Sequence, residues 1–230
     1  MKLYTYFRSS AAYRVRIALN LKGLGYEAIP VHLLKDGGQQ RQEEYRRINP
    51  SGLVPAFQDE RITLTQSMAI IEYLEERFPA VPLLPQDVAG RARVRELAQI
   101  IGCDIHPLNN LRVLRHLVHE FKITEEQKTA WIRHWISEGL AGLEAHLARD
   151  PAAGPFCHGQ SPTIADCFLV PQVFNAQRFD IDIAAYPNIA RIYALCVDMP
   201  AFAGAQRRDL PIGRRPSSSP SASSCSGRQR

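Results

Sequence analysis

The sequence predicts an α/β domain followed by an all-helical domain. Three observations support this prediction: two strand-like segments flank an amphipathic helix, a tight turn joins two later short strands, and no strand pattern recurs after about residue 64. A strand, a helix and a strand in so short a span form a parallel, right-handed βαβ unit. Strands joined by a tight turn are antiparallel. We therefore expect a mixed four-stranded sheet within residues 1–78.

The elements of the first domain follow closely on one another. The first helix ends at Gly23, and the last helix is stopped by Pro79. A polar loop with a short helix separates the two pairs of strands. The expected strands lie at residues 2–7, 26–33, 56–58 and 62–64, and the expected longer helices lie at residues 10–22 and 68–78.

A stiff, proline-rich linker at residues 79–88 leads into the second domain. Residues 89–203 carry helical patterns only, and Pro107 is expected to kink the first of these helices. Residues 204–230 contain arginine, serine, proline and glycine without a period, so we expect a disordered basic tail. The four expected helices lie at residues 89–121, 124–148, 163–179 and 187–199.

The net charge of +5 does not indicate a nucleic-acid partner. Six arginines and one aspartate in residues 204–230 account for all of it, since the remaining residues hold 22 basic and 22 acidic side chains. No apolar run is long enough to cross a membrane, and the first residues lack the apolar core of a secretion signal. We expect a cytoplasmic protein without nucleic-acid or membrane partners.

The five cysteines, an odd number without a C-x-x-C pair, predict neither a disulfide framework nor a zinc site. Most are expected to be small core residues in a reducing compartment. His116 and His119 lie three residues apart on a predicted helix, a spacing that a metal site could use. Because no further cluster of ligands accompanies them, we interpret them as part of a solvated helix face and expect no metal.

Two short motifs could bind a ligand, and each also has a purely structural interpretation. In LVPA, a cis bond before Pro55 would let Val54 offer its backbone N–H and C=O to a ligand, whereas a trans bond would give a simple strand entry. In TQSM, the helix start at Gln66 and Ser67 could bind a carboxylate. Alternatively, Ser67 is a plain N-cap.

A third motif, FRSSAAYRVRIALNLKG at residues 7–23, places Ser9 and Ser10 at the start of a helix. Hydroxyl donors and the helix dipole at such a position would lower the pKa of a thiol. Ala11 and Ala12 offer no thiol, so the thiol would belong to a ligand. A helix cap is the alternative interpretation.

These motifs, in this order, resemble the glutathione transferases, and specifically their zeta class. FRSSAAYRVRIALNLKG, KDGGQQ, NPSGLVPA and TQSMAIIEYLEERFP resemble the N-terminal domain of that class, and GCDIHPLNNLRVL and PTIADCFLVPQVFNAQRFDIDIAAYPNI resemble its second domain. The resemblance covers residues 1–203 and is to the bacterial isomerases of this class that act on maleylacetoacetate. It implies the glutathione transferase fold with a thioredoxin-like first domain, glutathione as the cofactor, and a homodimer.

The same resemblance implies roles for individual residues. Pro55 would be cis, and the backbone of Val54 would pair with the cysteinyl unit of glutathione. Ser9 and Ser10 would lie by the sulfur, and Ala11 stands where the family commonly has a cysteine. The remaining implied contacts are Gln66 and Ser67 with the γ-glutamyl end, Gln40 with the glycyl end, and His106, Asn110, Leu111 and Arg112 along the cleft beside the cofactor.

Arg178 and Arg8 are implied to grip a carboxylate of the substrate, because a guanidinium fork binds carboxylate in bidentate fashion. A salt bridge at the rim of the cleft is the alternative for each. Thr163 and Asp166 match the S/T-x-x-D capping box, so we interpret Asp166 as a residue of the fold and not as a general base.

The implied reaction is the glutathione-dependent cis–trans isomerisation of maleylacetoacetate, a small dicarboxylate, to fumarylacetoacetate in tyrosine and phenylalanine catabolism. A related isomerase acts on maleylpyruvate and tends to carry an arginine where Leu111 stands here. Transfer of glutathione to α-haloacids and a non-catalytic binding role on the same fold are further alternatives. Leu111 favours maleylacetoacetate over maleylpyruvate.

Overall fold

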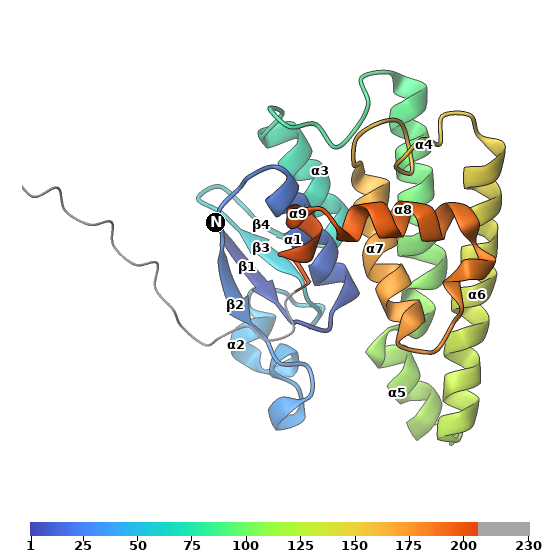
Figure 1. Ribbon diagram of the computed structural model, residues 1–230. Coiled ribbons are helices and arrows are strands. Elements are labelled where there is room, and N and C mark those ends of the chain that lie inside the picture. Colours follow the sequence, from blue (N-terminus) through green and yellow to red (C-terminus); the bar gives the residue numbers. More distant parts are fainter. Residues whose placement is uncertain (207–230) are drawn as a thin grey trace, which may run out of the picture.

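The structure is a computed structural model, and it describes residues 1–206. Figure 1 shows two parts, a small sheet with its helices on one side and a group of longer helices on the other. Of the expected tail, residues 204–206 are described and Ala205 is fully buried, whereas residues 207–230 lie outside the described residues. Within residues 1–206, no helix combines the length and the apolar character needed to cross a bilayer.

The first part is built on the mixed four-stranded sheet that the sequence predicted, and the strand order is β2-β1-β3-β4. β1 (Lys2–Thr5) pairs in parallel with β2 (Glu27–Pro30), which confirms the βαβ unit. β3 (Ala56–Gln58) is antiparallel to both β1 and β4 (Thr63–Thr65), so the predicted hairpin is confirmed as well.

Alternating side chains give this sheet two apolar faces. Leu3 and Phe57, which are partners in the β1–β3 register, are fully buried in the main core. Their neighbours Tyr4 and Ala56 belong to a smaller cluster that includes Tyr45 of the short helix α2 (Glu43–Arg46). The period of two along a strand explains why adjacent residues enter different cores.

Helix α1 (Ser10–Leu21) belongs to both parts of the molecule. It packs against α3 (Ser67–Arg77) on the sheet side and against α7 (Ile164–Gln177) of the helical part. Every residue from Ala12 to Leu19 is buried, including two arginines. The helix therefore has no solvent-facing side along its middle, and it fixes the first domain against the second.

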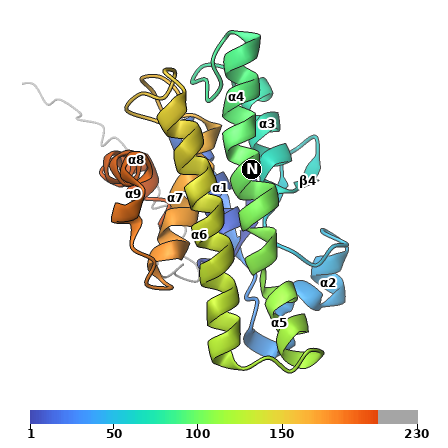
Figure 2. The same cartoon turned by 90° about the vertical axis from the view of Figure 1, so that its right-hand side faces the viewer.

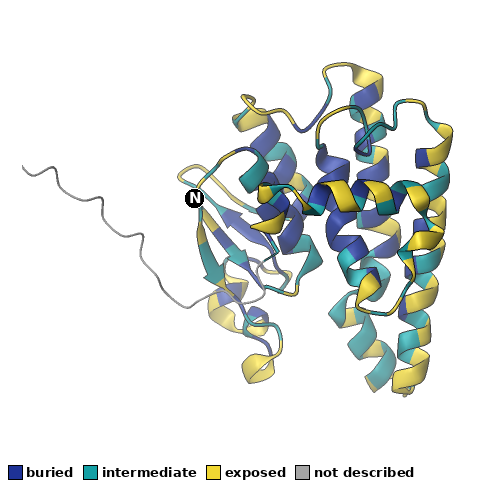
Figure 3. Ribbon diagram, viewed as in Figure 1, coloured by how far each residue is buried: buried dark blue, intermediate teal, exposed yellow. Residues whose placement is uncertain are grey.

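The helical part surrounds α7, in which every residue from Ile164 to Val173 is buried (Figure 3). α7 packs against α4, α6 and α8 (Figures 1 and 2). The helices expected at residues 124–148, 163–179 and 187–199 are confirmed. Their observed bounds, with those of their neighbours, are α4 (Val88–Gln99), α6 (Glu125–Arg149), α8 (Pro187–Val197) and the short α9 (Pro200–Ala203).

The prediction of one kinked helix over residues 89–121 is wrong, because the chain forms two separate helices there. After α4 come a π-helical turn (Ile100–Ile105), a 3-10 turn (Pro107–Asn109) and α5 (Leu111–His119). Pro107 has no N–H to donate to the preceding turn. Asn110 adopts an extended backbone, and its Oδ1 accepts the N–H of Arg112 at 3.1 Å. Asn110 therefore caps a new helix instead of continuing the old one.

A buried ion pair ties down the connection between the two parts. Lys22 Nζ lies 2.6 Å from Glu75 Oε2 and also donates to the carbonyl of Val81 at 2.8 Å. Glu75 in turn accepts the N–H groups of Leu83 and Leu84 at 2.9 and 3.1 Å. Because both charges are hydrogen-bonded, this buried pair holds the linker against α1 and α3.

The end of the described chain returns to α1. The guanidinium of Arg16 donates from Nε to the carbonyl of Ala205 at 2.9 Å and from Nη1 to the hydroxyl of Thr5 at 2.8 Å. Asn20 donates to the carbonyl of Ala201 at 2.9 Å. These bonds place residues 204–206 on the first domain, so the packed part of the chain extends past the predicted boundary at residue 204.

The capping box predicted at the start of α7 is confirmed. Asp166 is fully buried and accepts three hydrogen bonds, from the N–H of Thr163 at 2.7 Å, the hydroxyl of Thr163 at 2.8 Å and the N–H of Cys157 at 2.9 Å. Burial raises the pKa of Asp166 above the ordinary carboxyl value. A carboxyl group enclosed in this way serves the fold.

We expect Asp166→Ala to lower the free energy of unfolding by about 3 kcal/mol, because three buried donors lose their acceptor at once. Asp182→Ala is the matched control: Asp182 also caps a helical turn, accepting the N–H of Ala184 at 2.9 Å, but it is exposed. Its loss should cost about 1 kcal/mol. Urea unfolding curves measure both values. An Asp166→Ala protein that unfolds at the wild-type midpoint would contradict the structural role.

Candidate active site

The start of α1 presents two hydroxyl groups. Ser9 is the N-cap, and its Oγ accepts the N–H of Ala12 at 3.1 Å. Only the oxygen of Ser9 is used in this bond, so its hydroxyl hydrogen can still be donated to a ligand. Ser10 is the first helical residue, and the first turn contains no acidic side chain. A helix cap and a donor to a ligand are therefore compatible roles for this motif.

The start of α3 differs from the prediction. Ser67 is not the N-cap, because Gln66 occupies that position and Ser67 is the first helical residue. Gln66 has φ 68° and ψ 117°, a backbone region that residues other than glycine rarely adopt. Its side chain makes no capping hydrogen bond, and the first turn of α3 has no acid. The free N–H groups and the dipole at this helix start suit an anionic ligand.

The bond between Val54 and Pro55 is cis, as the resemblance implied. Both residues are buried just before β3. The carbonyl of Leu53 accepts the hydroxyl of Tyr45 and the side-chain amide of Asn49, each at 2.6 Å. These two bonds fix the loop that leads into the cis bond.

Gln40 lies in a 3-10 turn before α2 and is only 5% exposed. Its Nε2 donates to the carbonyl of Leu33 at 3.4 Å, while its Oε1 has no hydrogen-bond partner within residues 1–206. A Cβ at Gly38 would come within 2.8 Å of Nε2, so this packing depends on glycine. The implied contact of Gln40 with the glycyl end of glutathione stays a prediction.

Arg14 is a residue of this region that the sequence analysis missed. It is 3% exposed, its Nη1 donates to Ser67 Oγ at 3.3 Å, and its guanidinium carbon lies 4.2 Å from the centre of the Phe168 ring. Its Nε and Nη2 have no hydrogen-bond partner in the described part of the chain. Burial lowers the pKa of Arg14 to about 9, so it remains charged at neutral pH. A buried cation with free donors beside a helix start suits a bound anion.

His106 follows the π-helical turn, whose defining bond joins its N–H to the carbonyl of Ile101 at 3.0 Å. Burial, together with the charge of Arg14, lowers the pKa of His106 to about 3. The imidazole is therefore neutral at pH 7, with one ring nitrogen as a donor and the other as an acceptor. The same turn that breaks the predicted helix brings His106 near Arg14.

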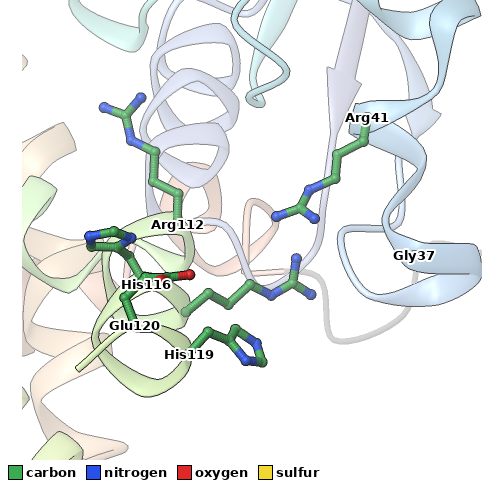
Figure 4. A pocket seen from close by; sticks show the side chains of 7 residues that line it. Gly37, Arg41, Arg112, His116, His119 and Glu120 are labelled. Atoms are coloured by element: carbon green, nitrogen blue, oxygen red, sulfur yellow. The ribbon is translucent and has the colours of Figure 1, made fainter. Parts of the chain in front are cut away.

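The start of α5 holds three further predicted residues. Asn110 uses Oδ1 as the helix cap, which leaves its Nδ2 available to a ligand. Leu111 is the first helical residue and is partly buried. Arg112 is exposed and lines a basic cleft between α5 and the loop that contains Arg41 (Figure 4).

Arg8 and Arg178 approach each other from different domains. Arg8 immediately precedes the cap of α1, and Arg178 is the C-cap residue of α7. Partial burial lowers the pKa of Arg178, and the charge of Arg8 lowers it further. Neither arginine forms a salt bridge within residues 1–206. Two like charges held near each other without a carboxylate suit a ligand that carries one.

Comparison with known proteins identifies the family. The model of the glutathione S-transferase N-terminal domain matches residues 1–76, and that of the glutathione S-transferase C-terminal domain matches residues 129–195. A holo structure of maleyl pyruvate isomerase, described as a bacterial zeta-class glutathione S-transferase, has a TM-score of 0.87 and 47% identity, and the match covers 91% of this chain and 99% of that one. This chain belongs to the zeta class of the glutathione S-transferase family.

Further relatives of this glutathione S-transferase have names that specify reactions. The maleylacetoacetate isomerase of Pseudomonas aeruginosa is 50% identical over 92% of this chain and 98% of its own length. The maleylpyruvate isomerase of a Ralstonia species is 48% identical over 93% and 98%. The maleylacetoacetate isomerase of Methylobacterium extorquens AM1, solved with malonate and glutathione bound, has a TM-score of 0.86 at 42% identity over 90% and 96%.

In this transferase, side chains from both domains meet around the starts of α1 and α3. Arg14 contacts Ser67 directly and influences His106 through its charge. Arg8 and Arg178 add a second cationic group. The start of α1 holds hydroxyl donors but, with Ala11 in place of cysteine, no thiol. A thiol nucleophile at this helix start would therefore have to come from a ligand.

A pH dependence of stability follows from His106. Below about pH 6.5 the unfolded chain binds a proton at this residue that the folded chain does not, so stability is present above that pH and is lost as the pH falls toward 3. Between about pH 7 and about pH 5, the free energy of unfolding should fall by about 1 kcal/mol less in His106→Asn than in the wild type. This value allows for the partial exposure of His106. Urea unfolding at several pH values measures this difference.

His119→Asn, at an exposed position on α5, is the control for exchanging a histidine for an asparagine as such. Parallel curves for the wild type and His106→Asn would mean that the imidazole of His106 is solvated in the folded state, and would contradict the prediction.

Proposed function

We propose that this chain catalyses the glutathione-dependent cis–trans isomerisation of maleylacetoacetate to fumarylacetoacetate. The observation that carries the proposal is the pair Arg8 and Arg178, an unneutralised cationic group next to a helix start that offers hydroxyl donors but no thiol. A dicarboxylate substrate and an imported thiol complete such a site. The relatives from Pseudomonas aeruginosa and Methylobacterium extorquens support the same reaction.

The residues present fit glutathione. The free Nε and Nη2 donors of Arg14 and the uncapped start of α3 suit the carboxylate of the γ-glutamyl end, with Gln66 and Ser67 beside it. Because Ser67 Oγ accepts from Arg14, the hydroxyl hydrogen of Ser67 is left to donate to that carboxylate. Val54 would offer its backbone to the cysteinyl unit, as the family resemblance implies.

The chain's own groups then support the reaction. When bound, glutathione supplies a thiolate that adds reversibly to the cis double bond and so permits rotation about it. The hydroxyls of Ser9 and Ser10 and the dipole of α1 stabilise negative charge on the sulfur. Arg8 and Arg178 hold the substrate by its carboxylates and stabilise the negative charge that develops on its carbonyl oxygen.

The second candidate substrate is maleylpyruvate, because a maleylpyruvate isomerase is nearly as similar to this chain as the maleylacetoacetate isomerases are. The two substrates place different demands on the start of α5. Leu111 brings an apolar, partly buried side chain and no charge to that position. We therefore favour maleylacetoacetate, whose longer chain needs no additional cation there.

We further propose that the protein is a cytoplasmic homodimer. The cysteines of the described residues, Cys103, Cys157, Cys167 and Cys196, are all free. Free thiols suit the reducing compartment in which glutathione itself is kept reduced. The homodimer rests on the resemblance to the family.

Replacing Ser9 tests the role of the hydroxyl separately from the helix cap. Because glycine is tolerated at an N-cap, Ser9→Gly should lower the free energy of unfolding by only a few tenths of a kcal/mol. Ser9→Ala should lower it by about 1 kcal/mol. Both variants should reduce kcat/KM by about 10²-fold, because both lose the donor to the sulfur. Both should also raise the pKa of the bound thiol, which the ultraviolet absorbance of the thiolate reports. Full activity of Ser9→Gly would show that Ser9 is only a cap.

The substrate is tested with maleylacetoacetate and maleylpyruvate side by side, at saturating glutathione. We expect the wild type to prefer maleylacetoacetate and Leu111→Arg to shift the ratio of kcat/KM values toward maleylpyruvate by about tenfold, the value of one added charged hydrogen bond. Leu111→Gln, which is polar but uncharged, should shift the ratio much less. Turnover of neither substrate by the wild type would overturn the proposed function.

A further inference from the structure

One histidine supports the loop before α2, which carries Gln40 and Arg41. His32 Nδ1 accepts the backbone N–H groups of Leu34 at 3.2 Å and of Lys35 at 2.9 Å. A ring nitrogen that accepts hydrogen bonds carries no proton, so the neutral imidazole has its N–H at Nε2. The imidazole of His32 therefore serves this loop as a hydrogen-bond acceptor and not as a cation.

The turn that follows His32 has an unusual backbone. Asp36, Gly37 and Gly38 have φ angles of 53°, 75° and 105°, all in the left-handed region. Because Asp36 is not a glycine, its conformation costs free energy that the surrounding contacts must offset. Figure 4 shows Gly37 on this loop, across the cleft from α5. The two hydrogen bonds to His32 Nδ1 fix the entry to this strained turn.

Further hydrogen bonds connect His32 to the other end of the loop. Its backbone N–H donates to Gln39 Oε1 at 2.8 Å, and its carbonyl accepts the N–H of Gln39 at 2.9 Å. The next residue, Gln40, donates from its side chain to the carbonyl of Leu33 at 3.4 Å. Residues 32–40 thus form a closed loop, and the position of Gln40 depends on the turn that His32 supports.

Elsewhere in the chain, side-chain oxygens fill the same role. Asp59 Oδ1 accepts the N–H groups of the residues two and three positions ahead, Arg61 and Ile62, each at 2.9 Å. Asn49 Oδ1 accepts the N–H of Ser51 at 3.0 Å. Such local bonds are typical of aspartate and asparagine. Their oxygens accept hydrogen bonds throughout the range from about pH 5 to about pH 8, whereas an imidazole nitrogen that takes up a proton becomes a donor.

The surroundings of His32 offer little compensation for a positive charge. The ring of Tyr6, directly after β1, lies 5.0 Å from the imidazole ring, and Tyr6 in turn interacts electrostatically with Arg178. Lys35 and Asp36 belong to the same loop, and both are exposed. In the described part of the chain, no carboxylate forms a salt bridge with His32. A protonated imidazole would therefore lose two N–H donors and gain no ion pair.

We propose that His32 is a positioning residue for glutathione, holding the loop in the form that presents Gln40 to the glycyl end only while its imidazole is neutral. The inference rests on the proposed function for the contact between Gln40 and glutathione. His32 acts through the loop and not through contact with the cofactor. The loop is therefore held for binding at about pH 7.5, and protonation of His32 releases it as the pH falls toward about 5.5.

The experiment measures the Kd of S-methylglutathione, whose sulfur carries no proton that could titrate. Isothermal titration at about pH 7.5 and about pH 5.5 compares the wild type with His32→Asn and His32→Ala. The matched control is His146→Asn, since His146 is an exposed histidine near the end of α6. The pKa of His106 is about 3, so that imidazole stays neutral throughout this range.

We expect the wild-type Kd to rise by about fivefold between the higher and the lower pH, and His146→Asn to follow it. His32→Asn, whose Oδ1 can accept the same N–H groups, should bind like the wild type at the higher pH and keep that Kd at the lower one. His32→Ala should bind about tenfold more weakly at both, the value of one to two hydrogen bonds. In the isomerase reaction, His32→Ala should raise the KM for glutathione and leave kcat nearly unchanged.

Equal wild-type Kd values at the two pH values would overturn the role of His32, as would a His32→Asn protein that keeps the wild-type pH dependence. These two measurements decide the question even if His32→Ala does not fold. A wild type that does not bind S-methylglutathione would overturn both the role of His32 and the proposed function. Binding with the expected pH dependence but without isomerase activity would overturn the proposed reaction alone.

Discussion

One buried charge, Arg14, constrains the boundary between the two domains. Removing a guanidinium from water costs several kcal/mol unless other groups compensate. Here the hydroxyl of Ser67, from the first domain, accepts one N–H, and the ring of Phe168, from the second, lies 4.2 Å from the guanidinium carbon. Both domains must therefore be in place around α1 for Arg14 to be accommodated. Burial, together with the same charge, lowers the pKa of His106, so the protonation of an imidazole in the second domain depends in part on an arginine of the first.

The geometry of the site follows from the double packing of α1. The sheet and α3 hold one side of this helix and α7 holds another, so the position of its N-terminus is fixed by both domains. Ser9 and Ser10 stand at that N-terminus, and the hydroxyl of Ser67 is drawn toward the same helix by Arg14. Groups on rigid helix ends keep their positions more accurately than groups on free loops. Under the proposed function, two helix dipoles and three hydroxyls would act on one bound ligand.

Much of this fold could be predicted from the sequence, because the decisive signals were local. The period of the apolar residues, the turn between β3 and β4 and the capping box at Thr163 and Asp166 each depend on a few neighbouring residues. The break within residues 89–121 depends instead on a competition between continuing the first helix and starting a second one. The helical pattern continues through that stretch, but Asn110 offers the chain a cap for a new helix, and the cap prevails over continuation.

The candidate site was less accessible to sequence reasoning, because its properties arise from tertiary contacts. Ser67 has the residue type that helix caps prefer, yet the positive φ of Gln66 moves the cap by one position, and nothing local specifies that angle. Arginine is rarely buried, so no local signal marks Arg14 as a residue of the site. The second domain covers the part of α1 that carries it. The continuous burial of Ala12–Leu19 becomes visible only when both neighbours of the helix are known.

The pairing of charges also depends on tertiary contacts and cannot be read from local sequence. Outside residues 204–230 the chain is electrically balanced, and that balance suggests a featureless surface. Acidic groups pair with selected cations, as Glu75 does with Lys22, whereas Arg8, Arg41 and Arg178 form no salt bridge within residues 1–206. Net charge therefore does not describe the field that a ligand meets. The guanidinium groups of Arg8, Arg41 and Arg178 are exposed, so salt screens their attraction for an anion, and that attraction depends on local pairing and not on the total charge.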